Sequence, residues 1–150
     1  ESDGNKAMKP LIRIDADLVR PNGIVLSPDE SILYVADRKA NYIYAYDIDS
    51  PGKVKNKRVF ARLNGGEGPG SDGMCVDQQG RLYATGFSKV WVFEPTGQLV
   101  ATIPVAKPTI NVTFAKDNKI LYITANKGLY RMPLNTDAPL KHTKYSKDKE

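Results

Sequence analysis

The chain has few of the residues that build the commonest nucleophilic and metal centres. Among its 150 residues there is one cysteine, Cys75, and one histidine, His142. A single cysteine excludes an intrachain disulfide and leaves the redox compartment open. Cys75 lies in an apolar run and His142 in a polar tail, so we expect no Cys-His pair and predict that Cys75 is a small buried residue.

Long hydrophobic runs and long helical patterns are also missing. No run reaches the roughly 18 apolar residues of a transmembrane helix, so no membrane span is expected. No window of about ten residues keeps a 3.6-residue period, which predicts essentially no helix. With 41% hydrophobic and 26% charged residues, the composition is that of a folded globular domain.

An excess of positive charge is present but is not concentrated. The formal net charge is +5, and four of the 22 basic residues are lysines in the tail, residues 136–150, where three acidic residues also lie. The basic residues form no dense tract with interleaved aromatics, which is the usual pattern of a nucleic-acid site. We interpret the tail as a solvated end, and expect neither a nucleic-acid partner nor a membrane.

What the chain does have is one pattern repeated three times. An oxygen-bearing side chain opens a short apolar run at Asn22, at Asp72 and at Asn111. A Leu-Tyr pair follows each opener, and these tyrosines lie 49 and 39 residues apart, at Tyr34, Tyr83 and Tyr122. Such spacings are near the roughly 40–50 residues of a four-stranded propeller blade.

We therefore predict an all-β chain that forms a partial β-propeller domain over residues 1–150. The expected blades span residues 18–63, 72–105 and 110–135, each built of about four strands except the third, which lacks an obvious fourth. Residues 11–18 alternate apolar and polar side chains and are predicted to be an outer strand of a preceding blade.

Three blades are too few to close a propeller, which needs at least about four. We expect this chain to be the C-terminal half of a larger propeller, or to close by pairing with a second chain. Its open ends should make it dimerise, aggregate or bind a complementary fragment. A compact, stable monomer in sedimentation would contradict this expectation.

The first strands of propeller blades line the central channel, so the three openers should meet at one mouth of that channel. Amide and carboxylate oxygens are donors that Ca²⁺ prefers, although Ca²⁺ takes about 6–8 of them. The alternative is that Asn22, Asp72 and Asn111 only form Asx turns that start their strands. The pattern by itself leaves both interpretations open.

Two motifs resemble a known family. Arg20-Pro21-Asn22-Gly23-Ile24 and Ser71-Asp72-Gly73-Met74 are similar to motifs of the senescence-marker-protein/gluconolactonase/luciferin-regenerating-enzyme family. The resemblance implies a six-bladed propeller that binds a divalent metal in its channel and hydrolyses lactones. It implies that Asn22 and Asp72 are metal ligands, that Asp72 also assists catalysis, and that Asn111 only lines the channel.

The sequence departs from that family in two ways. Ser71 stands where the family commonly has proline, and the family's glutamate ligand and substrate-contacting asparagine lie in N-terminal blades that are not in this chain. The Glu67-Gly68-Pro69 stretch mimics the glutamate motif but sits in the wrong blade, so it receives no role. We therefore expect the metal, Ca²⁺ or else Zn²⁺, to bind poorly to this chain alone.

The resulting expectation is a metal-dependent hydrolase of the gluconolactonase type, acting on a small-molecule lactone. Two alternatives remain. One is a phosphotriesterase-like or aryl-ester hydrolase that uses the same metal residues on the same scaffold. The other is a non-catalytic propeller that serves as a binding module.

Overall fold

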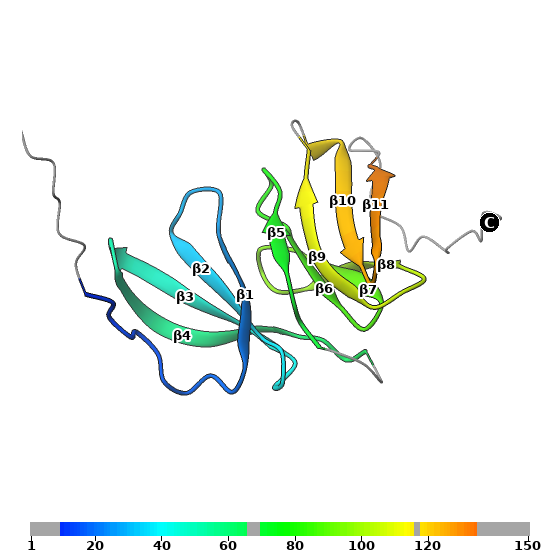
Figure 1. Ribbon diagram of the computed structural model, residues 1–150. Coiled ribbons are helices and arrows are strands. Elements are labelled where there is room, and N and C mark those ends of the chain that lie inside the picture. Colours follow the sequence, from blue (N-terminus) through cyan, green and yellow to red (C-terminus); the bar gives the residue numbers. More distant parts are fainter. Residues whose placement is uncertain (1–9, 66–69, 116–117, 135–150) are drawn as a thin grey trace, which may run out of the picture.

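The chain is all-β in the computed structural model, which describes residues 10–65, 70–115 and 118–134 (Figure 1). Eleven strands form three antiparallel sheets, and no α-helix occurs in these ranges. The same ranges contain no helix that is long and apolar enough to cross a membrane.

The strands of each sheet follow one another in chain order, as hairpin-connected neighbours. The first sheet contains β1 (Pro21–Leu26), β2 (Ile32–Asp37), β3 (Tyr42–Ser50) and β4 (Lys53–Arg62). The second contains β5 (Met74–Val76), β6 (Leu82–Gly86), β7 (Lys89–Phe93) and β8 (Leu99–Pro104). The third contains β9 (Thr109–Phe114), β10 (Ile120–Ala125) and β11 (Gly128–Pro133).

Acidic side chains close the turns between the first two strands of a sheet. Asp77 accepts hydrogen bonds from the backbone N–H groups of Gln79 and Arg81, at 3.0 and 2.9 Å, and from Nε of Arg81 at 2.6 Å. In the first sheet, Asp29 bonds the hydroxyls of Ser27 and Ser31. These side-chain bonds replace water for turn groups that the sheet ladder leaves unpaired.

Two hydrophobic cores lie between the sheets. Tyr34 and Leu82 belong to the core between the first and second sheets, and Tyr83 and Leu121 to the core between the second and third. Successive side chains of a strand point to opposite faces. The Leu82-Tyr83 pair of the second sheet therefore sends its two residues into different cores, whereas the pairs of the first and third sheets each contribute one residue to a core.

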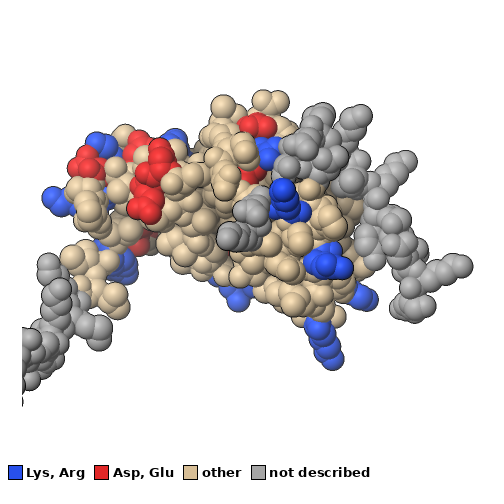
Figure 2. Space-filling model, turned by 90° about the horizontal axis from the view of Figure 1, so that it is seen from above, with Lys and Arg blue, Asp and Glu red and all other residues tan. Residues whose placement is uncertain are grey.

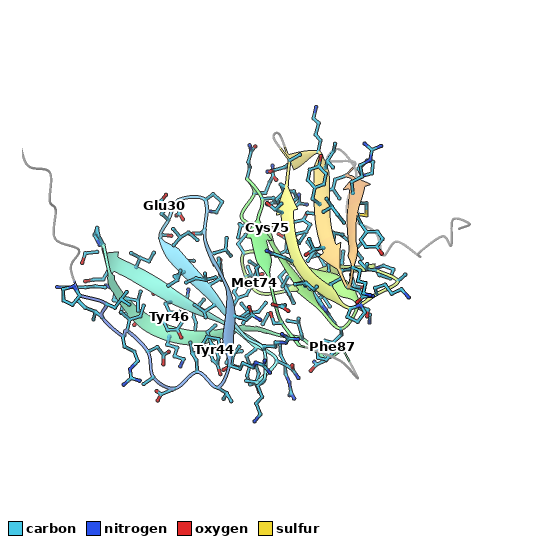
Figure 3. All side chains as sticks on the ribbon, viewed as in Figure 1. Glu30, Tyr44, Tyr46, Met74, Cys75 and Phe87 are labelled. Atoms are coloured by element: carbon cyan, nitrogen blue, oxygen red, sulfur yellow. The ribbon has the colours of Figure 1, made fainter. Side chains whose placement is uncertain are left out.

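Strand β5 shows the same alternation. Met74 belongs to the first core and Cys75 packs against the second. Figure 3 labels both residues on β5. Cys75 is half-buried and free, and burial, together with the charge of Asp77, raises the pKa of its thiol to about 12. This raised pKa favours the protonated thiol at neutral pH, which is the less nucleophilic form.

Both ends of the stack expose apolar side chains. On the first sheet, Ile24 is 65% exposed and Leu26 is 39% exposed, on the face turned away from the second sheet. On the third sheet, Leu129 is 73% exposed. Within the described ranges nothing covers these faces, which is the arrangement expected of an open row of blades.

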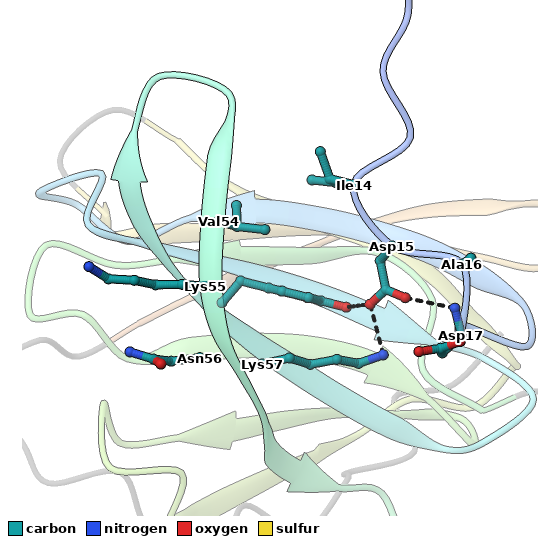
Figure 4. A pocket seen from close by; sticks show the side chains of 9 residues that line it. Ile14, Asp15, Ala16, Asp17, Val54, Lys55, Asn56 and Lys57 are labelled. Atoms are coloured by element: carbon teal, nitrogen blue, oxygen red, sulfur yellow. Dashed lines mark hydrogen bonds and ion pairs between the residues drawn. The ribbon is translucent and has the colours of Figure 1, made fainter.

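The prediction of an outer strand over residues 11–18 is wrong. Residues 10–20 form no strand, and Leu11 and Ile12 are fully or largely exposed, so their alternation does not mark a buried face. The segment is held instead by Asp15, which accepts from Oη of Tyr46 at 2.5 Å and lies 2.7 Å from Nζ of Lys57 (Figure 4). The side-chain interactions of Asp15 thus hold this segment in place of the backbone hydrogen bonds that a strand would form.

The charged side chains are dispersed over the face that Figure 2 shows. Uncharged surface separates the Lys and Arg side chains there, and acidic side chains lie among basic ones at one end. This face therefore lacks the continuous basic stripe typical of nucleic-acid-binding surfaces. The lysine-rich tail falls outside the described residues.

A buried carboxylate ties the entrance of β1 to the end of β2. Asp37 is 1% exposed and accepts backbone N–H groups of Val19, Arg20 and Ala40 at 2.7, 3.0 and 3.2 Å. Burial alone would raise the pKa of Asp37, but these backbone bonds outweigh it and hold the pKa below its usual value. The ionised carboxylate therefore fixes the chain just before Asn22.

We predict that Asp37→Asn lowers the free energy of unfolding by about 1–3 kcal/mol at pH 7, because the amide places N–H groups against backbone donors. The pKa of Asp37 is lower in the folded state, so its stabilisation is present above the unfolded pKa, about 3.9, and is lost as pH falls through the folded pKa. Urea unfolding at pH 7 and pH 3 measures both effects.

Asp47→Asn is the matched control, because Asp47 forms an exposed ion pair with Arg58 on the outer strands. Its cost at pH 7 should stay below about 1 kcal/mol. The loss of stability between pH 7 and pH 3 should be smaller in Asp37→Asn than in the unsubstituted chain. An equal loss in both would show that protonation of Asp37 does not cause the acid sensitivity.

Candidate functional site

The three predicted site residues lie on neighbouring strands. Asn22 is on β1, Asp72 is two residues before β5, and Asn111 is on β9. These inner strands, each at one edge of its own sheet, lie next to one another in the order β1, β5, β9 (Figure 1). The arrangement brings the three openers into one row, which we call the mouth.

Two glycines make this close approach sterically feasible. A Cβ on Gly23, directly after Asn22, would lie 2.0 Å from the backbone oxygen of Asp72. A Cβ on Gly73, directly after Asp72, would lie 2.0 Å from Oδ1 of Asn111. Because such distances are well below van der Waals contact, each glycine provides the space in which the next opener sits.

A buried threonine joins the loop before β5 to the second and third sheets. The N–H of Asp72 donates to the carbonyl of Thr85 at 2.9 Å, and the N–H of Gly73 donates to that of Ile110 at 2.9 Å. The Thr85 hydroxyl lies 2.9 Å from the Gly73 oxygen and 3.0 Å from the Ile110 oxygen. These bonds set the position of Asp72 relative to Asn111.

A second threonine makes a similar connection deeper in the same interface. Thr109 is 1% exposed, and its hydroxyl accepts the N–H of Gly86 and donates to the carbonyl of Lys89, both at 2.9 Å. Sequence reasoning gave neither Thr109 nor Thr85 a role. The sequence could have pointed to both threonines, because each is a hydroxyl residue in an apolar strand. A buried hydroxyl needs a hydrogen-bond partner inside the protein.

The Asp72 carboxylate is largely buried and faces a positive side chain. Its residue is 8% exposed, and Nη1 of Arg38 lies 3.5 Å from Oδ2. Burial raises the pKa of Asp72 above its usual value, while the charge of Arg38, the polar side chain of Asn22 and the charge of Arg20 act against that rise. Asn22 therefore lies close enough to Asp72 to affect its pKa, in addition to occupying the equivalent position of the sequence repeat.

Arg38 was not among the residues singled out from the sequence. Its place follows from antiparallel pairing, because Pro21 on β1 stands opposite Asp37 on β2. The residue after β2 must then lie beside the residue that precedes β1, and the N–H of Arg38 donates to the carbonyl of Arg20 at 3.0 Å. The position of Arg38 could have been predicted only from the pairing register of the β1–β2 hairpin.

The local hydrogen bonds of the openers bear on the Asx-turn alternative. Oδ1 of Asn111 accepts the N–H of Val112, the next residue, at 2.9 Å, whereas an Asx turn bonds the N–H two residues on. Within the described residues, the carboxylate of Asp72 accepts no backbone N–H. The Asp72 carboxylate is therefore not tied to a turn, and it faces Arg38 instead.

The donor chemistry of the mouth fits a hard cation in kind. Asp72 offers carboxylate oxygens, and Asn22 and Asn111 offer amide oxygens, which are the donors of Ca²⁺ sites. Three side chains supply only part of the about 6–8 oxygens that Ca²⁺ takes. In the described ranges no three His, Cys, Asp or Glu side chains gather as a metal cluster, and Glu67 lies outside those ranges.

We predict that Gly23→Ala and Gly73→Ala each lower the free energy of unfolding by at least about 3 kcal/mol, at or beyond the usual cost of overpacking. The added methyl meets the backbone of Asp72 in one case and the Cα of Asn111, 2.8 Å away, in the other. Backbone atoms cannot rotate aside as side-chain ends can. Urea unfolding provides the measurement.

Gly52→Ala is the control, because Gly52 has a φ of +80° and a methyl group added there would meet no atom within 4 Å. It should cost about 1–2 kcal/mol from backbone strain alone. Equal costs at all three positions would mean that the close approach of the inner strands is not what the glycines provide.

Comparisons with known proteins agree with the arrangement of the sheets. The gluconolactonase of Xanthomonas campestris superposes with a TM-score of 0.75 at 36% identity, over 83% of this chain and 41% of that one. A calcium-binding protein, regucalcin, from Agrobacterium tumefaciens superposes with a TM-score of 0.67 at 26% identity, over 76% of this chain and 40% of that one. The predicted all-β propeller-blade fold is thereby confirmed.

Sequence relatives include more than one activity. The gluconolactonase of Zymomonas mobilis is 34% identical over 132 residues, which are 82% of this chain and 37% of that protein. The diisopropyl-fluorophosphatase of Loligo vulgaris is 29% identical over 126 residues, 78% of this chain and 40% of that protein. This chain thus spans about two fifths of the length of these relatives.

The sequence profile of one family, described as the SMP-30/Gluconolactonase/LRE-like region, matches residues 3–127, which is most of the chain. That span includes Asn22, Asp72 and Asn111. The chain belongs to the SMP-30/gluconolactonase/LRE-like family, and its three sheets form part of a propeller of that family.

Proposed function

We propose that this chain supplies one side of the active site of a metal-dependent lactone hydrolase of the gluconolactonase type. The observation that supports it is the row of Asn22, Asp72 and Asn111, brought together by the two glycines that follow the first two of them. The gluconolactonases among the relatives favour a lactone as the substrate class.

The proposed site divides the work between a cation and this chain's own side chains. A bound divalent cation, Ca²⁺ or else Zn²⁺, would polarise the lactone carbonyl and stabilise negative charge on its oxygen. Asn22 and Asp72 would hold that cation, and Asn111 would line the mouth beside them. The calcium-binding regucalcin among the structural relatives favours Ca²⁺.

Asp72 is the residue to which we assign the proton transfer. Its carboxylate takes a proton from the attacking water, whose oxygen bonds to the carbonyl carbon. The ring C–O bond then breaks, and the ring oxygen leaves with a proton to give a hydroxy acid. Burial, which raises the pKa of Asp72, favours its role as a proton acceptor.

A bound cation acts in the opposite direction on the same group. It lowers the pKa of a ligand carboxylate and thereby weakens it as a base. Holding the cation is therefore the primary role of Asp72 in this proposal, and proton transfer is the secondary one. The two roles separate experimentally, because metal affinity and turnover are measured independently.

A phosphotriesterase-like activity is the second candidate, favoured by the similarity to diisopropyl-fluorophosphatase. It would use the same mouth and the same carboxylate, with a phosphorus centre in place of the carbonyl carbon. Parallel assays with glucono-1,5-lactone and diisopropyl fluorophosphate separate the two. A propeller that only binds a partner would turn over neither compound.

We predict that this chain alone binds Ca²⁺ weakly, with a Kd of about 10⁻³ M or higher, because it offers three side-chain ligands at most. An N-terminally extended chain that carries further blades should bind at least about tenfold more tightly. Calorimetric titrations with Ca²⁺ and with Zn²⁺ on both chains measure this difference. Absence of binding by either chain would overturn the proposed metal site.

We predict that Asp72→Ala in the extended chain weakens Ca²⁺ binding at least about tenfold and lowers lactone hydrolysis at least about 100-fold. Asp47→Ala, which removes a carboxylate from the outer part of the same blade row, should change neither. Hydrolysis that survives Asp72→Ala would contradict the assignment, whereas partner binding by an outer surface would survive it in any case.

A further inference from the structure

The mouth contains one charge pair that the proposed function does not use. Nη1 of Arg38 lies 3.5 Å from Oδ2 of Asp72, with the side chains 30% and 12% exposed. Asp72 is the one ion-pair partner that Arg38 has among the described residues. The sole carboxylate of the proposed metal site is thus already faced by a cationic group.

The backbone of Arg38 is held by its neighbours, whereas its side chain is 30% exposed. Its N–H donates to the carbonyl of Arg20, and its own carbonyl would lie 2.5 Å from a Cβ on Gly70. Gly70 in turn packs against Oδ1 of Asn41, at the other end of the same turn. The turn between β2 and β3 therefore packs closely against the loop that carries Asp72.

Other charges at the mouth do not replace that of Asp72. Asp37 directs its oxygens to three backbone N–H groups and is 1% exposed. Arg20 adds a second positive charge that acts on Asp72. A cation that enters the mouth therefore meets two guanidinium groups and one carboxylate that is already engaged.

We propose that Arg38 is a built-in competitor of the metal ion, a positioning residue that neutralises Asp72 and must withdraw from its carboxylate when the cation binds. This inference rests on the proposed metal site. The reason is electrostatic: the Arg38 guanidinium and a bound cation would both lie within a few ångström of the same carboxylate oxygens, and two positive groups so close together repel each other. Arg38 then sets how tightly the mouth holds a cation.

The test is a Ca²⁺ titration at low ionic strength of the unsubstituted chain, Arg38→Gln and Arg38→Lys, in this chain and in the N-terminally extended one. Removing the guanidinium charge should tighten Ca²⁺ binding about tenfold in Arg38→Gln. Arg38→Lys, which keeps the charge, should stay within about threefold of the unsubstituted chain. The gain in Arg38→Gln should shrink as salt is added.

Arg58→Gln is the matched control, because it makes the same change in net charge at an exposed pair with Asp47 on the outer strands. It should leave Ca²⁺ affinity unchanged. The direction of the effect is diagnostic, since structural damage at the mouth would weaken Ca²⁺ binding. An Arg38→Gln affinity equal to or lower than that of the unsubstituted chain would overturn the competition.

A measurement on the unsubstituted chain covers the case in which Arg38→Gln does not fold. The NMR signal of the Arg38 Nε–Hε group should shift on addition of Ca²⁺, whereas that of Arg58 should not. A stationary Arg38 signal while Ca²⁺ binds would reject the competition and leave the metal site intact. Absence of Ca²⁺ binding by every chain would instead reject the proposed metal site, and this inference with it.

Discussion

The close approach of the inner strands is the constraint on which the rest of the structure depends. Gly23 and Gly73 carry no Cβ where one would fall 2.0 Å from the neighbouring opener, so β1, β5 and β9 come together. The Asn-Gly and Asp-Gly pairs are therefore packing motifs first. They also position the residues of the proposed site, since the space that glycine leaves is filled by an oxygen-bearing residue of the next blade.

The two cores maintain that approach from the other side of the strands. The second sheet contributes alternate residues to the two cores, as Leu82 and Tyr83 do, so it cannot shift without disturbing two interfaces. Buried hydroxyls add direction to this packing, because Thr85 and Thr109 bond backbone groups across the second and third sheets. Rigid neighbours of this kind are what a polar site needs in order to keep its geometry.

Most of the fold was accessible from the sequence, because strand alternation and the repeat of opener and tyrosine are local signals. The openers Asn22, Asp72 and Asn111 were found in this way, and the structure brings them into one row. Residues 11–18 were misassigned because alternation does not supply a neighbouring strand edge. Arg38 was missed because its position depends on hairpin register, which composition and spacing do not reveal.

The proposed role of Asp72 as a metal ligand conflicts with the burial of its carboxylate. A metal ligand must be ionised, yet burial of this group favours its neutral form and raises its pKa. Arg38 eases the conflict, because a guanidinium 3.5 Å away stabilises the ionised carboxylate before any cation arrives. In the proposed metal site, the same pairing would make cation binding an exchange of one positive partner for another. Under that proposal, the pairing with Arg38 favours the ionised form of the carboxylate at the expense of affinity for the metal.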